Sequence, residues 1–282
     1  MKKLILASFL MLVANAAIAE KVEILPTSTL KGPHGKVINS VVELSKSAGF
    51  EFTASQKNGC GETVNYFENA KGPIAIIWSN TMIKNGLTSK QNCTINFKKA
   101  KAVAVTFAPY ELCVLKGKKL EANRSYILGN NKFNPQTTIL TELNKNKKGI
   151  TFTNVTYSGS GPAIAGLINK EIEIAYAATG NASSAIKKGS IDCLYTTGAS
   201  KYGQKPLSEF TGTDSPLNTY SLGMMLFVKN MSADQIRQLE KSLAKNFEKQ
   251  MYQKDMVNSK VGINKSDFNK FYESAKLYGT YK

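Results

Sequence analysis

Reactive side chains are scarce in this sequence of 282 residues. It has one histidine, His34, one tryptophan, and two arginines, Arg124 and Arg237. The patterns GxSxG, HExxH and GxxxxGK[ST] are missing, which excludes a nucleophile elbow, a zincin helix and a P-loop. A cysteine nucleophile would also need a histidine base. We therefore expect no enzyme activity, no cofactor and no metal ion; a hydrolase that depends on His34 is the alternative.

Long apolar runs are missing beyond the first 20 residues, so no later segment matches the roughly 20 apolar residues of a membrane-spanning helix. The chain begins "MKKLILASFLMLVANAAIAE", in which two lysines precede the apolar residues 4–13 and "AIA" fits a small-x-small cleavage pattern. This predicts a signal peptide at residues 1–19, cleaved after Ala19; an N-terminal anchor is the alternative. We expect the mature chain to be exported to the periplasm.

Acidic residues are few, 20 against 37 basic ones, for a formal net charge of +17, or +15 once the two lysines of residues 1–19 are removed. Nearly all of the positive charge is lysine, scattered through segments such as "KKAKAV", "KGKKL" and "NKNKK". Nucleic-acid surfaces usually combine arginine with interleaved aromatic residues, so we expect a solvated basic surface and no nucleic-acid partner. The alternative is a secreted basic protein that adheres to polyanions.

Strand and helix patterns alternate along the mature chain. Continuous apolar runs such as "IAIIW" are typical of strands buried on both faces, and β-α-β units imply a parallel sheet. A capping box at Ser232 and Gln235 opens one of two closing helices. The expected strands are residues 22–25, 50–54, 74–78, 125–129, 150–157, 171–179, 191–198 and 221–230, and the expected helices are residues 35–48, 60–71, 135–143, 162–169, 182–188 and 267–277.

These patterns predict an α/β fold of two lobes with mostly parallel central sheets, the second lobe inserted into the first. The segment "KAVAVTFAPYELCVLKGKKL" predicts two extended stretches around Pro109, and the chain is expected to cross between lobes near residues 106–110 and 196–200. The predicted division is residues 20–107 with 218–282 for the first lobe and residues 108–217 for the second.

Four cysteines remain in the mature chain, and none forms a CxxC pair, so a zinc site is not expected. An even number in an exported protein favours disulfides, for which three pairings are possible. The two-lobe plan places Cys113 and Cys193 side by side, one on each crossover. We therefore expect Cys113–Cys193 and Cys60–Cys93; free buried thiols are the alternative.

Small polar residues gather at six turns where a predicted strand runs into a helix. In open parallel sheets ligands bind beyond the carboxyl ends of the strands, and helix N-termini offer free N–H groups and partial positive charge. Ordinary helix caps use the same residues, so only the six together predict a shared cleft that holds an anion without transforming it. The turns are Thr27-Ser28-Thr29, Asn58-Gly59-Cys60-Gly61, Ser79-Asn80-Thr81, Gly129-Asn130-Asn131, Ser158-Gly159-Ser160-Gly161 and Thr179-Gly180-Asn181.

Most of the mature chain resembles the periplasmic solute-binding receptors of tripartite tricarboxylate transporters, the Bug or TctC-like family. The resemblance is strongest in "YSGSGPAIAGLINKEIEIAYAATGNASSAIKKGSIDCLYTTGASKYGQKPLSEF" and continues in "NTYSLGMMLFVKNMSADQIRQLEKSLAKNF". It implies a type II periplasmic-binding-protein fold that closes on small carboxylates, held by backbone amides, hydroxyls and water. The implied ligand-binding residues are Thr27, Ser28, Thr29, Ser79, Asn80, Thr81, Ser158, Gly159, Ser160, Gly161, Thr179, Gly180 and Asn181, to which the fourth turn adds Asn131.

Before its first helix this chain departs from the family. The family commonly has a Gly-Gly-x-x-Asp type turn there, whereas this chain has "LKGPHGKV", which implies that Lys31 or His34 contacts the ligand instead. We expect a monomeric receptor that captures a small organic anion by hinge closure and presents it to integral-membrane transporter subunits. A receptor of a TRAP or ABC-type transporter for another anion is the near alternative.

Overall fold

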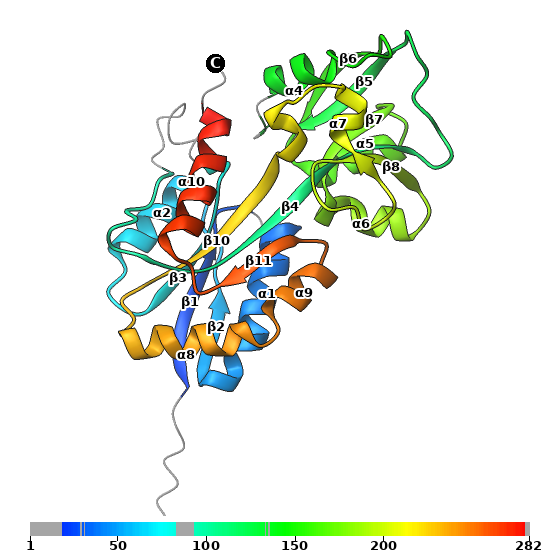
Figure 1. Cartoon of the computed structure of the whole chain (residues 1–282). Helices are drawn as coiled ribbons and strands as arrows, with labels where there is room; N and C mark the ends of the chain where they lie inside the picture. Colours follow the sequence, from blue (N-terminus) through cyan, green and yellow to red (C-terminus); the bar gives the residue numbers. More distant parts are fainter. Residues whose placement is uncertain are drawn as a thin grey trace, which may run out of the picture.

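The molecule consists of two α/β lobes that share one long strand (Figure 1). The computed structural model describes residues 19–28, 30, 32–82, 93–132, 134 and 136–279. The predicted signal peptide therefore lies outside the described residues except for Ala19. Within the described ranges no helix has the length and apolarity needed to cross a bilayer.

The sheet of the first lobe is mixed. Strands β2, β1 and β3 pair in parallel, as the β-α-β pattern predicts, and β10 and β11 run antiparallel to their partners. Strand β3 is buried at every position, which explains its continuous apolar sequence "IAIIWS". The strands of this sheet, in spatial order, are β2 (Phe50–Ala54), β1 (Glu20–Pro26), β3 (Ile74–Ser79), β10 (Ser221–Lys229), β4 (Lys101–Leu115) and β11 (Val257–Val261).

The sheet of the second lobe is built in the same way around parallel strands. Strand β5 pairs in parallel with both β6 and β7, while β4 runs antiparallel to β7 and β8. Its strands are β6 (Thr151–Tyr157), β5 (Ser125–Asn131), β7 (Ile174–Ala178), β4, β8 (Ile191–Thr196) and β9 (Lys205–Pro206).

Strand β4 joins the two sheets. Its residues 101–109 pair with β10, and its residues 110–115 pair with β7 and β8. The sequence prediction of two extended stretches is wrong, because Pro109 lies inside one continuous strand. Proline lacks a backbone donor, and it sits where β4 changes partners from one sheet to the other. Strand β10 carries the chain back from the second lobe into the sheet of the first.

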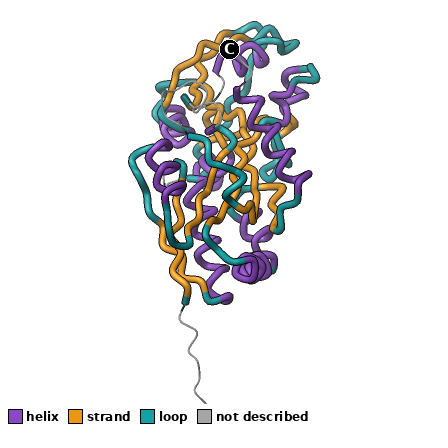
Figure 2. The backbone as a smooth tube through the Cα atoms, turned by 90° about the vertical axis from the view of Figure 1, so that its left-hand side faces the viewer, coloured by secondary structure: helices purple, strands orange, loops and turns teal. Residues whose placement is uncertain are grey.

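Helices lie on either side of the strands, as the view of Figure 2 shows. Helix α6 begins at Thr179, three residues earlier than predicted, and the helix α9 and edge strand β11 near the C-terminus were not predicted. The described helices are α1 (Pro33–Ser45), α2 (Cys60–Asn69), α4 (Gln136–Leu143), α5 (Ser160–Ile168), α6 (Thr179–Lys187), α7 (Leu207–Thr211), α8 (Ala233–Ala244), α9 (Phe247–Gln253) and α10 (Lys265–Gly279), with short 3-10 turns η1 (Lys46–Ala48) and η2 (Pro216–Thr219).

Two disulfides cross-link the chain, and the predicted pairing is confirmed. Cys113 on β4 faces Cys193 on β8 in the register of the second sheet and is bonded to it. Cys60 is bonded to Cys93 in the first lobe. The exact lobe boundaries at residues 107/108 and 217/218 stay a prediction.

Candidate functional site

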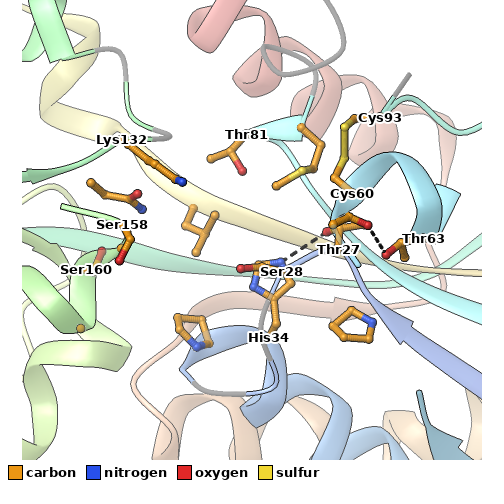
Figure 3. Close-up of a pocket in the computed structure, with 18 of the residues that line it drawn as sticks. Thr27, Ser28, His34, Cys60, Thr63, Thr81, Cys93, Lys132, Ser158 and Ser160 are labelled. Carbon is orange, nitrogen blue, oxygen red and sulfur yellow. Dashed lines mark hydrogen bonds between the residues drawn. A yellow bond between two sulfur atoms is a disulfide. The ribbon is translucent and has the colours of Figure 1, made fainter. Parts of the chain in front are cut away.

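A cleft of about 780 Å³ lies at the carboxyl ends of parallel strands from both sheets. Figure 3 shows its two sides facing each other, with Ser158 and Ser160 opposite Thr27 and Thr63. We call the first-lobe side the first bank and the second-lobe side the second bank. The first bank comprises Pro26, Thr27, Ser28, Pro33, His34, Gln56, Lys57, Gly59, Cys60, Thr63, Thr81, Met82 and Cys93, and the second bank comprises Asn131, Lys132, Ser158, Gly159, Ser160, Gly161, Pro162 and Asn181.

The cleft brings together most of the residues that the sequence singled out. On the second bank, the whole segment "SGSGP", which connects β6 to α5 and includes the first turn of α5, lines the cleft, and Asn131 and Asn181 join it from neighbouring elements. The first bank contributes Thr27, Ser28, Thr81 and His34. Thr29 and Lys31 lie outside the described residues, so their predicted contacts with the ligand stay a prediction.

Four of the predicted residues point into the protein interior instead of lining the cleft. The hydroxyl of Ser79 bonds that of Thr81 at 2.9 Å, and Asn80 donates to Ser221 O and accepts from Gly223 N. The hydroxyl of Thr179 donates to Pro109 O. The carbonyl of Gly180 accepts from the Lys36 ammonium at 2.8 Å. Asn80, Thr179 and Gly180 thus bond segments that are distant in sequence, whereas Ser79 bonds locally. The predicted ligand contacts of all four stay a prediction.

Three helices begin at the cleft, and among the described residues none of them has a side-chain cap. The N-cap residues of α1, α2 and α5 are Gly32, Gly59 and Gly159. The first amides of a helix have no partner within the helix, so these three starts leave N–H groups for other acceptors, except at Pro33 and Pro162, which have none. Each helix N-terminus also carries partial positive charge. Residues from all three helix starts line the cleft, an arrangement that favours an anion there.

The charges around the cleft favour an anion as well. No acidic residue belongs to the described lining, whereas Lys132 does, together with Lys57, whose charge is shared with Glu23 at 3.2 Å. In Figure 3 the Lys132 side chain extends from the second bank toward the cleft. Burial lowers the pKa of His34 to about 4, so this imidazole is neutral near pH 7. It lies 3.5 Å from the hydroxyl of Thr27, which itself donates to Ile77 O.

Sequence reasoning missed several lining residues. Lys57 and Gln56 follow β2, and Lys132 follows β5 directly after the predicted Asn131. The signal for Lys132 was its place at the carboxyl end of a parallel strand, but the scattered lysines were interpreted as solvated surface. Cys60 belongs to the turn Asn58-Gly59-Cys60-Gly61, which was predicted to face the cleft, whereas Cys93 was predicted only as its disulfide partner, and nothing local indicated that Cys93 lines the cleft.

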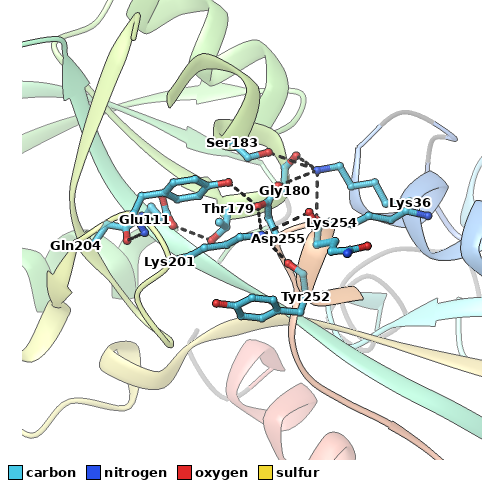
Figure 4. Close-up of polar contacts among 12 residues, drawn as sticks. Lys36, Glu111, Thr179, Gly180, Ser183, Lys201, Gln204, Tyr252, Lys254 and Asp255 are labelled. Atoms are coloured by element: carbon cyan, nitrogen blue, oxygen red, sulfur yellow. Dashed lines mark hydrogen bonds and ion pairs between the residues drawn. The ribbon is translucent and has the colours of Figure 1, made fainter. Parts of the chain in front are cut away.

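A second polar region, which we call the clasp, joins the lobes beside the cleft and consists of Lys36, Gly180, Lys201, Tyr202 and Asp255 (Figure 4). Asp255, between α9 and β11, is 4% exposed. Its carboxylate pairs with Lys201 at 2.8 Å and with Lys36 at 3.5 Å, and it accepts from the Tyr202 hydroxyl. Lys201 and Tyr202 follow β8 of the second lobe, so the clasp links the two lobes.

Burial and hydrogen-bond partners shift the pKa values of two carboxyl groups, Asp255 in the clasp and Glu111 next to it. Burial alone would raise the pKa of Asp255, but hydrogen bonds, first of all from Lys201, outweigh it and hold that pKa below its usual value. Glu111 on β4 is the opposite case, since burial raises its pKa to about 7 despite hydrogen bonds from Thr179 and Gln204. Its second oxygen, Oε2, has no hydrogen-bond partner in the described part of the chain.

Among the described residues, one grouping of side chains has the spacing of metal ligands. The grouping of three potential ligands consists of Glu111, Cys113 and Cys193. Both sulfur atoms are used in the Cys113–Cys193 bond, so they offer no thiolate to a metal ion.

The fold and the cleft define a two-lobed binding-protein architecture, and solved structures share it. Rpa4515 of R. palustris, solved with adipate, has a TM-score of 0.71 at 14% identity over 92% of this chain and 94% of its own. The periplasmic binding protein BugD has a TM-score of 0.69 at 14% identity over 92% and 95%. MatC of Rhodopseudomonas palustris, with bound malate, has a TM-score of 0.66 at 15% identity over 92% and 97%.

These likenesses show the fold, which is that of periplasmic binding proteins. The resemblance to the Bug family that the sequence predicted is thereby confirmed at the level of the fold. No protein-family model matches the chain, and no curated protein matches it in sequence.

Proposed function

We propose that this protein is a periplasmic solute-binding receptor that captures a small organic carboxylate in the cleft between its lobes. The observation that carries the proposal is the convergence of three helix N-termini, each with a glycine N-cap and no side-chain cap, on one cleft. Amides that no side chain satisfies are available to a carboxylate, and the helix dipoles favour its negative charge.

The chemistry of the lining supports binding without reaction. The cleft offers hydroxyls, amides and lysine ammonium groups, and its one imidazole is buried and neutral. General acid–base or nucleophilic catalysis would need a group with a pKa suited to proton transfer, held in reach of a bound reactant. The cleft therefore fits a receptor better than an enzyme.

Similar solved structures support a carboxylate as the ligand. Malate is bound in MatC and adipate in Rpa4515, and both molecules are dicarboxylates. We propose the ligand contacts to be the predicted residues that line the cleft, namely Ser28, His34, Thr81, Asn131, Ser158, Gly159, Ser160, Gly161 and Asn181, with Thr27 contributing packing because its hydroxyl and its N–H both donate to Ile77 O.

Capture by closure of the lobes is part of the proposal. Strands β4 and β10 connect the lobes, and each bank would contribute contacts that the ligand makes together only when the banks approach. A ligand shifts such an equilibrium by its differential affinity for the closed state. We further propose cleavage after Ala19, action as a monomer, and delivery of the ligand to a membrane transporter of the tripartite tricarboxylate type.

The proposal is tested by titrating purified residues 20–282 with malate, adipate, citrate and the matching neutral amides. A bound carboxylate at 100 times its Kd adds about 2.7 kcal/mol to the free energy of unfolding, which thermal unfolding detects. The amides are expected to cause no shift. No shift with any carboxylate would overturn the proposal, and binding of polyanions with a steep salt dependence would favour the adhesion alternative.

A further inference from the structure

The Cys60–Cys93 disulfide forms part of the wall of the cleft. Cys60 is the first residue of α2, Cys93 is 2% exposed, and both belong to the first bank. Figure 3 places their bond beside the start of α2, on the same side of the cleft as Thr81. The second disulfide, Cys113–Cys193, joins β4 to β8 and does not line the cleft. The two bridges therefore provide an internal comparison.

The wall around this disulfide is apolar. Met82 lines the same part of the first bank and packs with Cys93 in one hydrophobic cluster, which Cys60 borders. Thioether and disulfide sulfur atoms are polarisable and weak hydrogen-bond partners, so they suit methylene groups better than hydroxyls. The wall is also fixed in place, because the indole N–H of the fully buried Trp78 donates to Cys93 O at 2.9 Å.

Three polar donors on the first bank already have partners inside the protein. The hydroxyl of Thr63 donates to Gly59 O at 2.7 Å, and that of Thr27 donates to Ile77 O at 2.9 Å. The ammonium of Lys57 pairs with Glu23 at 3.2 Å and lies over the ring of Tyr66. A hydroxyl on the body of a ligand would thus find few donors here, whereas the helix amides remain available for carboxylates at its ends.

Building on the proposed function, we propose that the Cys60–Cys93 disulfide and Met82 form a specificity wall that selects carboxylates with an unsubstituted aliphatic body. The carboxylates bind at the helix N-termini, and the methylene groups between them pack on the sulfur atoms of the wall. A six-carbon dicarboxylate such as adipate therefore binds more tightly than the shorter, hydroxylated malate. Single methylene groups in apolar pockets change selectivity by about tenfold or more, so the preference is measurable.

The test compares Kd values for adipate and malate by calorimetry in residues 20–282 and in two double variants. The wild-type protein is expected to prefer adipate at least tenfold. Cys60→Ser with Cys93→Ser should lower adipate affinity about tenfold and change malate affinity less than threefold, because polar hydroxyls replace the sulfur wall. Cys113→Ser with Cys193→Ser is the matched control, and it should leave the ratio of the two Kd values unchanged even if thermal stability falls.

A third variant keeps the test decisive if the loss of the Cys60–Cys93 bond prevents folding. Met82→Gln has similar volume and leaves both disulfides intact, and it should also lower the preference for adipate. Equal wild-type affinities for the two ligands, or an unchanged ratio in the folded wall variants, would overturn the specificity wall while leaving the receptor function standing. Failure of both ligands and of every other carboxylate to bind would instead overturn the proposed function.

Discussion

The cleft and the clasp are both polar regions between the lobes, and they differ in where their hydrogen bonds go. In the clasp the buried Asp255 carboxylate is satisfied by Lys201, Lys36 and Tyr202 from both lobes. In the cleft the starts of three helices are left without a side-chain cap. Helix α8, remote from the cleft, has a full capping box at Ser232. The difference is the one that the proposed function requires, in which polar groups satisfied by the protein hold the fold and those left open are available to a ligand.

The largest effect is expected when an acidic side chain is placed at the N-cap of a helix that begins at the cleft. Gly159 has extended backbone angles, and a Cβ there would meet only Pro162 Cδ at an ordinary 3.8 Å. Gly159→Asp should therefore fold and cap α5, yet place a carboxylate where the ligand carboxylate is proposed to bind. We expect affinity for the best carboxylate to fall on the order of a thousandfold, about 4 kcal/mol, with no loss of thermal stability.

The matched control is Gly159→Ser, which caps the helix without adding charge. Its loss of affinity should be much smaller than that of the aspartate variant. If calorimetry gives the aspartate variant wild-type affinity, the start of α5 is not the anion site.

Glu111, next to the clasp, is only partly satisfied by the protein: Oε1 accepts from Thr179 and Gln204, but Oε2 has no hydrogen-bond partner among the described residues. Its pKa in the folded state is about 7, raised from 4.5, so the folded protein binds this proton more tightly than the unfolded chain does. The free energy of unfolding should thus fall as pH rises from about 4.5 to 7. Glu111→Gln removes this loss, and at pH 8 it should be more stable than wild type by on the order of 3 kcal/mol.

Urea unfolding of both proteins at pH 5 and pH 8 measures the effect. The difference between wild type and variant isolates Glu111 from His34, whose lowered pKa acts in the opposite sense, with stability lost as pH falls from about 6.5 to 4. A difference that is the same at both pH values would contradict the assignment.

Within the clasp, Asp255→Asn removes the charge that Lys36 and Lys201 share. We expect a loss of about 2 kcal/mol in the free energy of unfolding, less than for a fully buried pair because the two lysine side chains are 29% and 22% exposed. Glu209→Gln removes the exposed pair with Lys205 and should cost less than about 1 kcal/mol. Equal losses in urea unfolding would mean that the clasp contributes no more than a surface ion pair.

The smallest expected effect completes the comparison at the remote helix. Ser232→Ala removes the side chain that accepts from Gln235 N in the capping box of α8. The loss of stability should be about 1 kcal/mol, with carboxylate affinity unchanged. Compared with Gly159→Asp, this variant distinguishes the two kinds of helix start. Ser232→Ala should lower stability without changing carboxylate affinity, and Gly159→Asp should lower carboxylate affinity without lowering stability.

Much of the fold could be predicted because its signals are local. Apolar runs such as that of β3, the capping box at Ser232 and the alternation of strand with helix each depend on neighbouring residues. The edge strand β11 could not be predicted in this way, since its sequence "VNSKV" has only partly buried positions on one face and exposed ones on the other. Its pairing with β4 depends on the tertiary structure.

The cleft was predictable in kind but not residue by residue. Turns such as "SGSGP" mark the carboxyl ends of parallel strands, and those ends do meet. Whether a polar side chain at such a turn faces the cleft or the interior depends on distant partners: Asn80 is held by β10, and Thr179 by β4. The turn that contains Cys60 was predicted to face the cleft, but the position of Cys93 beside it also depends on the tertiary structure.

Strand β4 has a consequence for how the molecule can be divided. Because this single segment supplies hydrogen bonds to both sheets, neither half keeps an intact sheet when the other melts. Heating should therefore dissolve both halves in one cooperative transition, and a fragment containing only the inserted half would need the end of β4 to be expressed with it.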